Sequence, residues 1–546
     1  MAVTHTDVPQ LPADRNDAIR NPVLPGFHPD PSILRVGADY YIANSTFEWY
    51  PGVRIHHSRD LVHWRPVGGA LTEHRLLDLT GCRDSGGVWA PCLSYCDGLF
   101  HLIYTNVDTY AGAFWDTPNY LTTAPEIHGP WSEPVPLHAR GFDPSLFHDE
   151  DGRSWLLSTV CDWRPGRDSF AGIIAQQFDR TQRRLVGEPV TIFHGTSVGV
   201  TEAPHLYRRD GWYYLMTAEG GTGWEHQATV ARSRSVTGPY EVDPAGPLVT
   251  AVNHPELTLQ KAGHGSLVTT QNNEWYLAHL TSRPFTSRGR CVLGRETALQ
   301  RVEWSDDGWP RLVAGIPYDV VPAPTLPPHP WPEQAPDRDD FDSPTLAPDW
   351  STLRRPATPE WVSPDERPGH LRIHGGASPS SRRRPSLVGQ RVRHHWCSFS
   401  TVVEFSPTCY QHMAGLTAYY NSRQWHYLCV SHDEQYGVCA RVLSSDRGVV
   451  REIGAPISLA DWPRVHLRAD INGDLLRFGL AQDGEPWFML PEVLDASILS
   501  DDYAWELVDG EVQRMGFTGA FFGLWVQDLT GGDIVADFDH AQYEAT

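Results

Sequence analysis

Five stretches within the first 320 residues share one pattern of apolar and polar positions. Each runs from a small, acidic or histidine residue through a short apolar segment to a turn rich in Asp, Gly or Asn, and then into an aromatic and apolar strand. The units begin at Asp30, Ala90, Asp143, Ala203 and His264, which lie 60, 53, 60 and 61 residues apart. Short apolar segments on both sides of such a turn predict β-hairpins.

The spacing of the units leaves room for two further strands after each hairpin. Four strands in each of five repeats, without helical periodicity, predict a five-bladed β-propeller over residues 1–320. An ordinary β-sandwich with coincidental hairpins is the alternative. The regular spacing, which is kept over more than 230 residues, argues against it.

The pattern changes after the propeller. Residues 321–336 contain seven prolines, a composition typical of a stiff and extended linker, which we place at 321–340. Residues 341–546 predict a second all-β domain of two packed sheets, a concanavalin-like β-sandwich. Its clearest alternating segments are 398–405, 414–420, 427–432, 465–471 and 536–543. The basic segment 382–395 is interpreted as a solvated loop.

Composition limits the partners and the compartment. A net charge of −23 argues against nucleic acid and anionic membranes, which both attract clustered positive charge. The sequence contains no run of about 18 apolar residues, so no membrane-spanning helix is predicted. Nine scattered cysteines predict reduced thiols, and residues 1–20 show no signal peptide, so we expect a cytoplasmic protein. Lys261 is the only lysine, which excludes a catalytic lysine elsewhere. A homo-oligomer is left open.

Three carboxylates fall at or beside equivalent positions of the repeat. Asp30 opens the first unit, Asp143 opens the third, and Glu202 lies one residue before the matching position of the fourth. In a propeller, the residue that opens the innermost strand of each blade faces the central channel, so these acids should meet at one mouth of it. The offset of Glu202 requires it to lie on the turn into its strand, because neighbouring strand residues face opposite sides. Turn capping is the alternative role for such acids.

Carboxylates gathered in a deep pocket suit glycoside hydrolysis. One of them must stay protonated near neutral pH to donate to the leaving oxygen, while another must be ionised. Like charges at short range push their pKa values apart and allow this division. A pair about 6.5–9.5 Å apart leaves room for a water and inverts the anomeric centre, whereas a pair about 5–5.5 Å apart allows direct attack and retention.

The repeats and the segments between them resemble family 43 of the glycoside hydrolases, in particular its β-xylosidase branch with a C-terminal β-sandwich. The resemblance covers essentially the whole chain. It is carried by residues 26–64 (GFHPDPSILRVGADYYIANSTFEWYPGVRIHHSRDLVHW), 86–95 (GGVWAPCLSY), 141–152 (GFDPSLFHDEDG), 201–207 (TEAPHLY), 262–268 (AGHGSLV), 291–300 (CVLGRETALQ) and 516–531 (GFTGAFFGLWVQDLTG).

The resemblance implies an inverting enzyme and a role for each acid. Asp30 would be the general base that activates water, and Glu202 would be the general acid. Asp143 would orient the acid and tune its pKa. Arg295 of the LGRE motif and His264 of the GHG motif would lie in the sugar pocket.

Aromatic side chains and a metal complete the expected site. We expect Phe47 and Trp89 to line the pocket, with Phe521 reaching in from the second domain, although Phe517 or Phe522 could take its place. A lone histidine such as His264 is more often a hydrogen-bonded pocket residue than a metal ligand, but in some relatives the equivalent histidine helps to hold a calcium ion, through water, at the propeller centre, so a structural Ca²⁺ is the alternative. The chemistry itself requires no cofactor.

The sequence therefore predicts an exo-acting β-1,4-xylosidase that releases xylose from the non-reducing end of short xylooligosaccharides. The second domain would close one side of the pocket. An α-L-arabinofuranosidase, or an enzyme with both activities, is the first alternative, because the two terminal sugars present similar hydroxyls. A non-catalytic sugar-binding propeller is the second, and the three retained carboxylates count against it.

Overall fold

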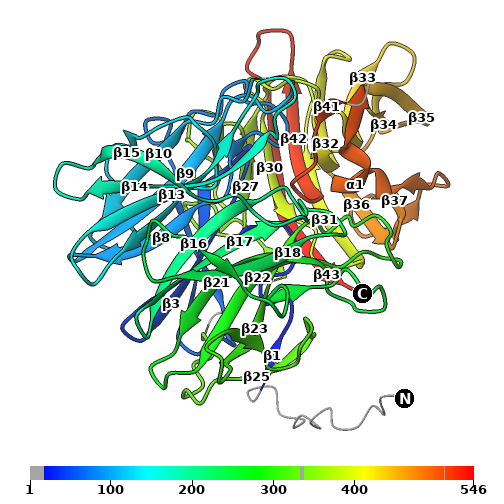
Figure 1. The fold of residues 1–546 in the computed structure, drawn as a ribbon. Helices are drawn as coiled ribbons and strands as arrows, with labels where there is room; N and C mark the ends of the chain where they lie inside the picture. The colour runs from blue at the N-terminus through cyan, green and yellow to red at the C-terminus, as the bar shows by residue number, and fades with distance from the viewer. Residues whose placement is uncertain (1–17, 113, 333–336, 509–510) are drawn as a thin grey trace.

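A computed structural model describes residues 18–112, 114–332, 337–508 and 511–546. Five small sheets form a ring, and two larger sheets pack beside it, as the blue-to-green and yellow-to-red parts of Figure 1 show. The described helices are η1 (Ala496–Ile498) and α1 (Asp501–Ala504), and no described helix has the length and apolar character needed to cross a bilayer. The predicted all-β class is confirmed. Most of the stretch interpreted as lacking a signal peptide, residues 1–17, lies outside the described residues.

Each repeat unit of the sequence forms one blade of the ring. Blade 1 contains β2 (Ser32–Val36), β3 (Asp39–Asn44), β5 (Gly52–Ser58) and β6 (Arg65–Leu71). Blade 2 contains β8 (Cys92–Cys96), β9 (Leu99–Val107), β10 (Asn119–Ala124) and β11 (Val135–Pro136), with β7 (Gly87–Val88) beside β9. Blade 3 contains β12 (Ser145–His148), β13 (Ser154–Cys161), β14 (Phe170–Asp179) and β15 (Arg184–Phe193). Blade 4 contains β16 (Glu202–Arg209), β17 (Trp212–Glu219), β18 (Gln227–Ser233) and β19 (Glu241–Val242), with β20 (Val249–Thr250) beside β18. Blade 5 contains β21 (Gln260–Thr269), β22 (Trp275–Ser282), β23 (Glu296–Trp304) and β24 (Pro310–Leu312).

The first strands of the blades are joined around the channel by side chains. The backbone N–H of Leu93 in blade 2 donates to Ser32 Oγ in blade 1 (3.0 Å), and that of Ile33 in blade 1 donates to Ser266 Oγ in blade 5 (3.2 Å). Outside the blades, β1 (Ala18–Arg20) pairs with β25 (Val320–Pro322). These bonds close the ring and hold the first strands at one axis.

The second part of the chain is a two-sheet sandwich. The larger sheet has the order β28 (Val362–Ser363), β29 (Leu371–His374), β43 (Val535–Ala545), β31 (Trp396–Glu404), β36 (Val465–Asn472), β37 (Leu475–Ala481) and β38 (Phe488–Met489), with β26 (Arg338–Asp339) beside β43 and β39 (Leu494–Asp495) beside β37. The other sheet has the order β35 (Val449–Ser458), β34 (Gly437–Asp446), β33 (Gln424–Asp433), β32 (His412–Asn421), β42 (Phe521–Asp528), β30 (Leu387–Arg391), β27 (Ser351–Leu353) and β4 (Trp49–Tyr50). A short hairpin joins β40 (Glu506–Val508) to β41 (Glu511–Arg514).

The eight-stranded sheet packs against the propeller as well as against its partner sheet. The strand predicted at 414–420 is β32, and all ten of its residues are buried, so the alternation of apolar and polar residues there does not correspond to alternating exposure. Leu416 and Tyr420 enter the core between the two sheets, whereas Tyr419 enters an aromatic core shared with the propeller. β4, a strand of the propeller sequence, pairs with β27 of the sandwich. The two domains therefore share both a core and a sheet.

The linker and the basic segment also pack against the propeller. In the linker, the indole N–H of Trp331 donates to the His63 carbonyl (3.1 Å), while residues 333–336 lie outside the described ranges. The basic segment is only partly the solvated loop that we expected. Its arginines 382–384 are exposed, but Arg391 lies in β30 and is 5% exposed. β30 lies between β42 and β27 in its sheet, and Arg391 Nε donates to the backbone carbonyl of Phe27 in the propeller (2.7 Å), so the side chain is buried at the contact between the domains.

Candidate active site

Three strands of the ring bring the predicted carboxylates into one recess. Asp30 lies just before β2, Asp143 just before β12, and Glu202 begins β16. Asp30 and Asp143 are buried, and Glu202 is partly exposed. The lining consists of Asp30, Phe47, Trp89, Ala90, Phe142, Asp143, Glu202, Thr222, His264, Arg295 and Phe517. The recess thus contains the three acids together with the predicted Arg295 and His264.

A residue with left-handed backbone conformation lies just before the first strand of two blades and within the first strand of two others. The residues that open four of the five repeat units, Asp30, Asp143, Ala203 and His264, have φ values of 52°, 52°, 52° and 47°. Positive φ is uncommon outside glycine, and Asp is among the residues that tolerate it best. The shared pattern of the sequence therefore includes a shared turn at the channel mouth.

The one-residue offset of Glu202 is explained by an irregular start of its strand. The pairing of β16 with β17 shifts between Glu202 and His205, and Ala203 within that shift has a positive φ. An extra residue in a strand breaks the strict alternation of side-chain direction. Glu202 therefore lines the same recess as Asp30 although it lies one residue out of register with it.

Asp30 is held by donors on both carboxylate oxygens. Arg295 Nη1 donates to Asp30 Oδ1 (2.9 Å), and Ser45 Oγ donates to Asp30 Oδ2 (2.5 Å). His264 Nδ1 lies 3.5 Å from Asp30 Oδ1. A buried carboxylate paired with a guanidinium and a hydroxyl is stabilised as the anion.

The other two acids have an environment that favours their protonated forms. Burial, together with the negative charge of Asp30, raises the pKa of Glu202 to about 8, against the opposing effect of Arg295. Burial and the charges of Glu202 and Asp30 raise the pKa of Asp143 well above its usual range. At neutral pH, Glu202 is therefore mainly protonated and can donate a proton.

Arg295 links the recess to the sandwich domain. Its guanidinium is 3% exposed and lies over the rings of Phe47 and Phe517, at 5.4 and 5.1 Å from their centroids. Its Nη2 donates to the backbone carbonyl of Phe517 (3.0 Å), which belongs to the sandwich domain. The position of the cation that holds Asp30 thus depends on both domains.

The structure corrects one predicted aromatic residue. Phe47 and Trp89 line the recess as expected, but the residue that reaches in from the second domain is Phe517 rather than Phe521. Phe521 is fully buried and stacks on Trp49, with 3.9 Å between ring centroids. The physical reason is that Phe521 begins β42, inside the eight-stranded sheet, whereas Phe517 lies in the loop before it.

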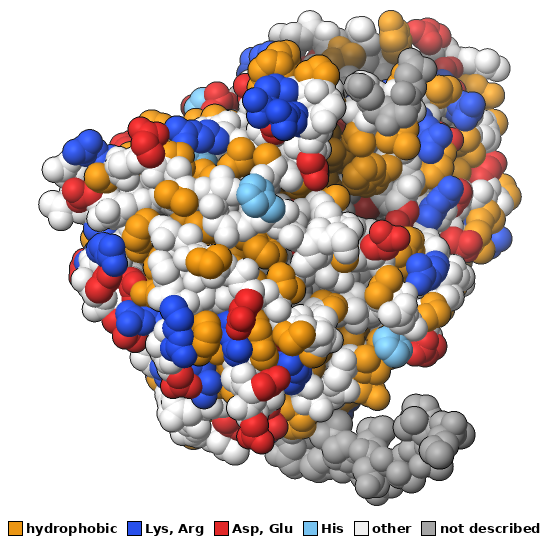
Figure 2. Space-filling model, in the orientation of Figure 1, with side chains coloured by type: hydrophobic (Ala, Val, Ile, Leu, Met, Phe, Trp, Pro, Cys, Tyr) orange, Lys and Arg blue, Asp and Glu red, His pale blue; other side chains and the backbone are white. Residues whose placement is uncertain are grey.

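A larger cavity of about 520 Å³ adjoins the recess and contains residues that sequence reasoning missed. It shares Trp89, Phe142, Glu202, Thr222 and Phe517 with the recess. Hydrophobic side chains gather in the hollow between the two parts of the molecule in Figure 2. Phe142 precedes Asp143 in the sequence, and that adjacency was the one available signal for it.

Charged residues from both domains line the wall of this outer cavity. Lys261, the single lysine, is buried, and its Nζ contacts Asp502 Oδ1 of α1 (2.5 Å). Asp501 accepts a hydrogen bond from the Tyr420 hydroxyl (2.6 Å), and burial raises the pKa of Asp501 to about 6. Nothing in the local sequence of α1 indicates this role, because the helix reaches the cavity only through the packing of the domains.

A calcium ion at the propeller centre is not supported. Within the described part of the chain, no group of three or more His, Cys, Asp or Glu side chains could hold a metal. Burial lowers the pKa of His264, which makes the imidazole neutral, and its ring lies beside Asp30 and Arg295. A cation there would meet the guanidinium that already neutralises Asp30.

A propeller with an acid of raised pKa opposite an arginine-bound carboxylate has the composition of a glycoside hydrolase active site. The family model for "Glycosyl hydrolases family 43" matches residues 19–310, and that for "Beta xylosidase C-terminal Concanavalin A-like domain" matches residues 338–544. The chain belongs to family 43 of the glycosyl hydrolases.

Full-length relatives agree with this assignment. The chain is 45% identical to "Beta-xylosidase" of Bacillus subtilis (strain 168), covering 96% of this chain and 99% of that protein. It is 45% identical to "Xylosidase/arabinosidase 43B" of Humicola insolens, covering 96% and 97%. The solved structure of xylan beta-1,4-xylosidase from Bacillus halodurans C-125 has a TM-score of 0.93 and 51% identity, and covers 96% of this chain and 100% of that one.

Proposed function

We propose that this protein is an exo-acting, inverting β-1,4-xylosidase that releases xylose from the non-reducing end of short xylooligosaccharides. The observation that carries the proposal is the pairing of Glu202, whose pKa is raised to about 8, with Asp30, which Arg295 and Ser45 hold as an anion in the same recess. The full-length similarity to β-xylosidases supports the choice of sugar.

Each acid has one task in the proposed reaction. The Asp30 carboxylate accepts a proton from a water molecule as the water oxygen attacks the anomeric carbon. The bond from that carbon to the leaving oxygen breaks, and this oxygen takes the proton of Glu202. Asp143 transfers neither proton in this scheme; the family resemblance assigns it the orientation of the acid and the tuning of its pKa, and burial together with the charges of Glu202 and Asp30 raises its own pKa. One water is consumed for each bond cleaved.

The shape of the site favours exo action. The small recess between the acids, Arg295 and Phe517 would take the terminal xylose, and the adjoining cavity of about 520 Å³ would take the rest of a short oligomer. Lys261, Asp501 and Asp502 are charged groups on that cavity wall that would meet the leaving part of the substrate.

The test combines substrates with variants. We expect the wild type to release xylose from xylobiose before it shortens xylan, and to release it first as the α-anomer in proton NMR spectra. Asp30→Ala and Glu202→Ala should each lose most activity on p-nitrophenyl β-xyloside. Random shortening of xylan without early xylose would refute exo action, and β-xylose as the first product would refute inversion. Full activity in either variant would refute the assigned roles.

Activity on α-L-arabinofuranosides is a second candidate. The Humicola insolens relative is named for both sugars, and the alignment with it spans nearly the whole chain. We expect measurable but weaker hydrolysis of p-nitrophenyl α-arabinofuranoside, lost in the same two variants because one recess would serve both sugars. Sugar binding without hydrolysis of either compound would instead indicate a non-catalytic propeller.

The reaction proposed here needs no cofactor, so activity should persist in the presence of a chelator. We also propose a cytoplasmic location, which the nine free thiols among the described residues favour. Cell fractionation tests it. A homo-oligomer is left open, and light scattering can measure the oligomeric state.

A further inference from the structure

A second cavity lies between blade 1, the linker and the edge of the sandwich. Its volume is about 430 Å³, and none of its lining residues belongs to the catalytic recess or to the outer cavity. The walls come from β5, from Trp331 of the linker and from the end of β30. The proposed reaction does not use this cavity, so its chemistry has to be explained separately.

The charge of this cavity is opposite to that of the chain as a whole. The four arginines Arg54, Arg65, Arg391 and Arg393 line it, and Asp349 is the one carboxylate among its described lining residues. Among the described residues, none of these four arginines forms an ion pair within 4.0 Å, although the chain carries a net charge of −23. An acidic protein that gathers unpaired arginines around a cavity offers a site for an anion.

Two of these arginines are buried together without a direct ion pair among the described residues, although the charge of Asp349 acts to raise the pKa of both. Arg54 is 1% and Arg391 is 5% exposed, and both donate to the same Ser351 Oγ, at 2.9 and 3.1 Å. Burial lowers the pKa of both guanidinium groups, to about 10 for Arg54, and their mutual repulsion lowers that of Arg391 further. Arg54 Nε is buried and has no hydrogen-bond partner in the described part of the chain. Buried charge of this kind is costly unless an opposite charge compensates it.

Two histidines add neutral donors to the same wall. His28 and His56 line the cavity, are 8% and 5% exposed, and have ring centroids 4.7 Å apart. Burial and the nearby arginines lower both pKa values, so the rings are uncharged at neutral pH. His56 Nδ1 is buried and lacks a partner among the described residues. The two imidazoles and four guanidinium groups together carry more hydrogen-bond donors than find acceptors among the described residues.

We propose that this cavity binds a phosphate group, either as inorganic phosphate or as the phosphate ester of a small polyhydroxy compound. A dianion matches four arginines and one carboxylate better than a singly charged carboxylate does, and guanidinium forks fit phosphate oxygens in bidentate geometry. The cavity is larger than a phosphate group needs, and Trp64 and Trp331 offer flat apolar walls for an attached sugar-sized group. Arg65 lies 3.9 Å over the Trp331 ring, so the linker covers one side of the site.

The experiment measures binding to the full-length protein by calorimetry, at constant ionic strength set with chloride. The probes are inorganic phosphate and glucose 6-phosphate, with glucose as the uncharged control. The test variant is Arg65→Gln with Arg393→Gln, because both side chains are at least partly exposed and removing them should not unfold the chain. The matched control is Arg477→Gln, an exposed arginine on β37 that does not line this cavity.

We expect saturable binding of one phosphate group per chain, weakened about tenfold or more in the double variant and unchanged in Arg477→Gln. Phosphate should also raise the melting temperature of the wild type and of the control more than that of the double variant. Tighter binding of glucose 6-phosphate would identify an ester, and equal binding would identify the free anion. No saturable binding at millimolar concentration, or equal binding by the double variant, would overturn the proposal.

Discussion

Glu202 and Asp30 line the same recess, but their surroundings favour opposite protonation states. Arg295 and Ser45 donate to Asp30, whereas burial and the charge of Asp30 raise the pKa of Glu202 to about 8. A carboxylate pair in which one member is an anion and the other an acid is the arrangement that glycoside hydrolysis needs. The division results from the neighbouring groups, because both side chains carry the same functional group.

This division predicts the alkaline side of the pH profile. Glu202, the proposed general acid, must be protonated to act, so kcat/KM should fall as the pH rises through about 8, the pKa of Glu202. The measurement is kcat/KM on xylobiose between pH 5 and 10. In Glu202→Gln, the remaining activity should not decline at this pH, because the amide does not titrate. An unchanged alkaline decline in that variant would assign the titration to another group.

The leaving group should distinguish the two proposed roles. Glu202→Gln should lower kcat on xylobiose by about 10²–10⁴-fold, since the sugar oxygen needs a proton to leave. On 2,4-dinitrophenyl β-xyloside the loss should be much smaller, because that phenolate leaves without protonation. Asp30→Asn is the matched control and should lose activity on both substrates alike. Equal losses for Glu202→Gln on the two substrates would contradict the acid role.

At the scale of the element, the left-handed turn at the channel mouth positions the site. Ala203 has a φ of 52° within the irregular start of β16, directly after Glu202. A β-branched side chain is disfavoured in this conformation, whereas glycine adopts it freely. The turn therefore connects backbone strain at Ala203 to the direction of the neighbouring Glu202, the proposed general acid.

Substitution of Ala203 tests this connection. Ala203→Val should destabilise the protein by about 1–2 kcal/mol and lower kcat, because relief of the strain would turn Glu202 away from the recess. Ala203→Gly is the matched control and should keep both stability and activity near wild type. The measurements are urea unfolding and xylobiose hydrolysis. A stable and fully active Ala203→Val would show that the turn does not position the acid.

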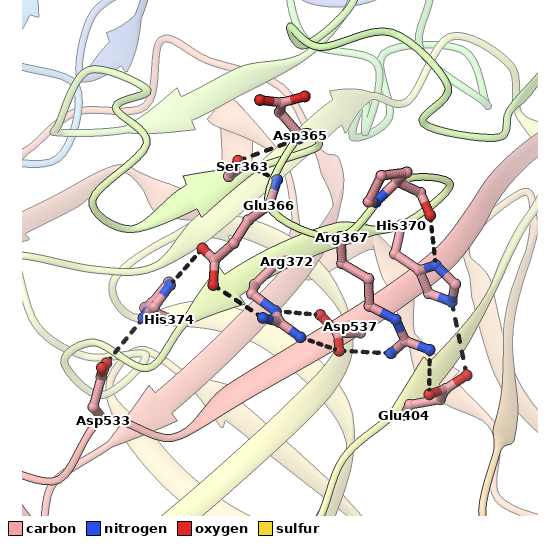
Figure 3. A network of polar contacts seen from close by, with 11 residues as sticks. Ser363, Asp365, Glu366, Arg367, His370, Arg372, His374, Glu404, Asp533 and Asp537 are labelled. Atoms are coloured by element: carbon pink, nitrogen blue, oxygen red, sulfur yellow. Dashed lines mark hydrogen bonds and ion pairs between the residues drawn. The ribbon is translucent and has the colours of Figure 1, made fainter.

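A charged network on the sandwich connects β29 to β43 and β31 (Figure 3). Arg372 forms two hydrogen bonds with Asp537, of 2.8 and 2.9 Å, and Arg367 adds a third of 2.6 Å. Although burial opposes it, these donors hold the pKa of Asp537 below its usual value. Asp537 is 6% exposed, so solvent screens these pairs less than the pairs of a surface carboxylate.

Removing this charge should destabilise the sandwich without changing the chemistry. Asp537→Asn should lower the free energy of unfolding by about 1–3 kcal/mol, because two arginines lose a charged acceptor. Asp533→Asn is the matched control: among the described residues this carboxylate pairs only with His374, and it is largely exposed, so the change should stay within about 0.5 kcal/mol. Urea unfolding measures both. Equal stability of the two variants would contradict a stabilising role for the network.

At the scale of the whole molecule, the sandwich completes the recess. Phe517 supplies a wall and the carbonyl that accepts from Arg295, and β4 joins the sandwich sheet through β27. The domains meet closely at Gly519, where an added Cβ would lie 2.7 Å from the carbonyl oxygen of Leu293. The backbone on both sides of this contact continues directly to Phe517 and to Arg295.

A methyl group at this contact should therefore disturb catalysis. Gly519→Ala should separate the two backbones, lower kcat/KM by about tenfold and cost about 1–3 kcal/mol of stability through overpacking. Gly532→Ala is the matched control, because its nearest neighbour atoms lie at the ends of the Thr530 and Asp528 side chains. Xylobiose kinetics and thermal unfolding measure both. Normal kinetics in Gly519→Ala would show that the domain contact does not position Arg295.

The sequence by itself determined the repeat, the all-β class and the positions of the three acids. The spacing of equivalent residues reflects blade geometry, which is local and recurs with each unit. Asp30 and Asp143 could be predicted because the same turn opens their blades, and Glu202 because it lies beside the equivalent turn.

Only the tertiary structure decided which residues the second domain contributes. Phe517 rather than Phe521 reaches the recess, Arg391 is buried instead of solvated, and β32 lacks alternation because both of its faces are covered. These outcomes depend on how the eight-stranded sheet packs against the propeller. Such contacts join residues hundreds of positions apart, and no local pattern of apolar and polar residues records which of two neighbouring side chains will face the partner domain.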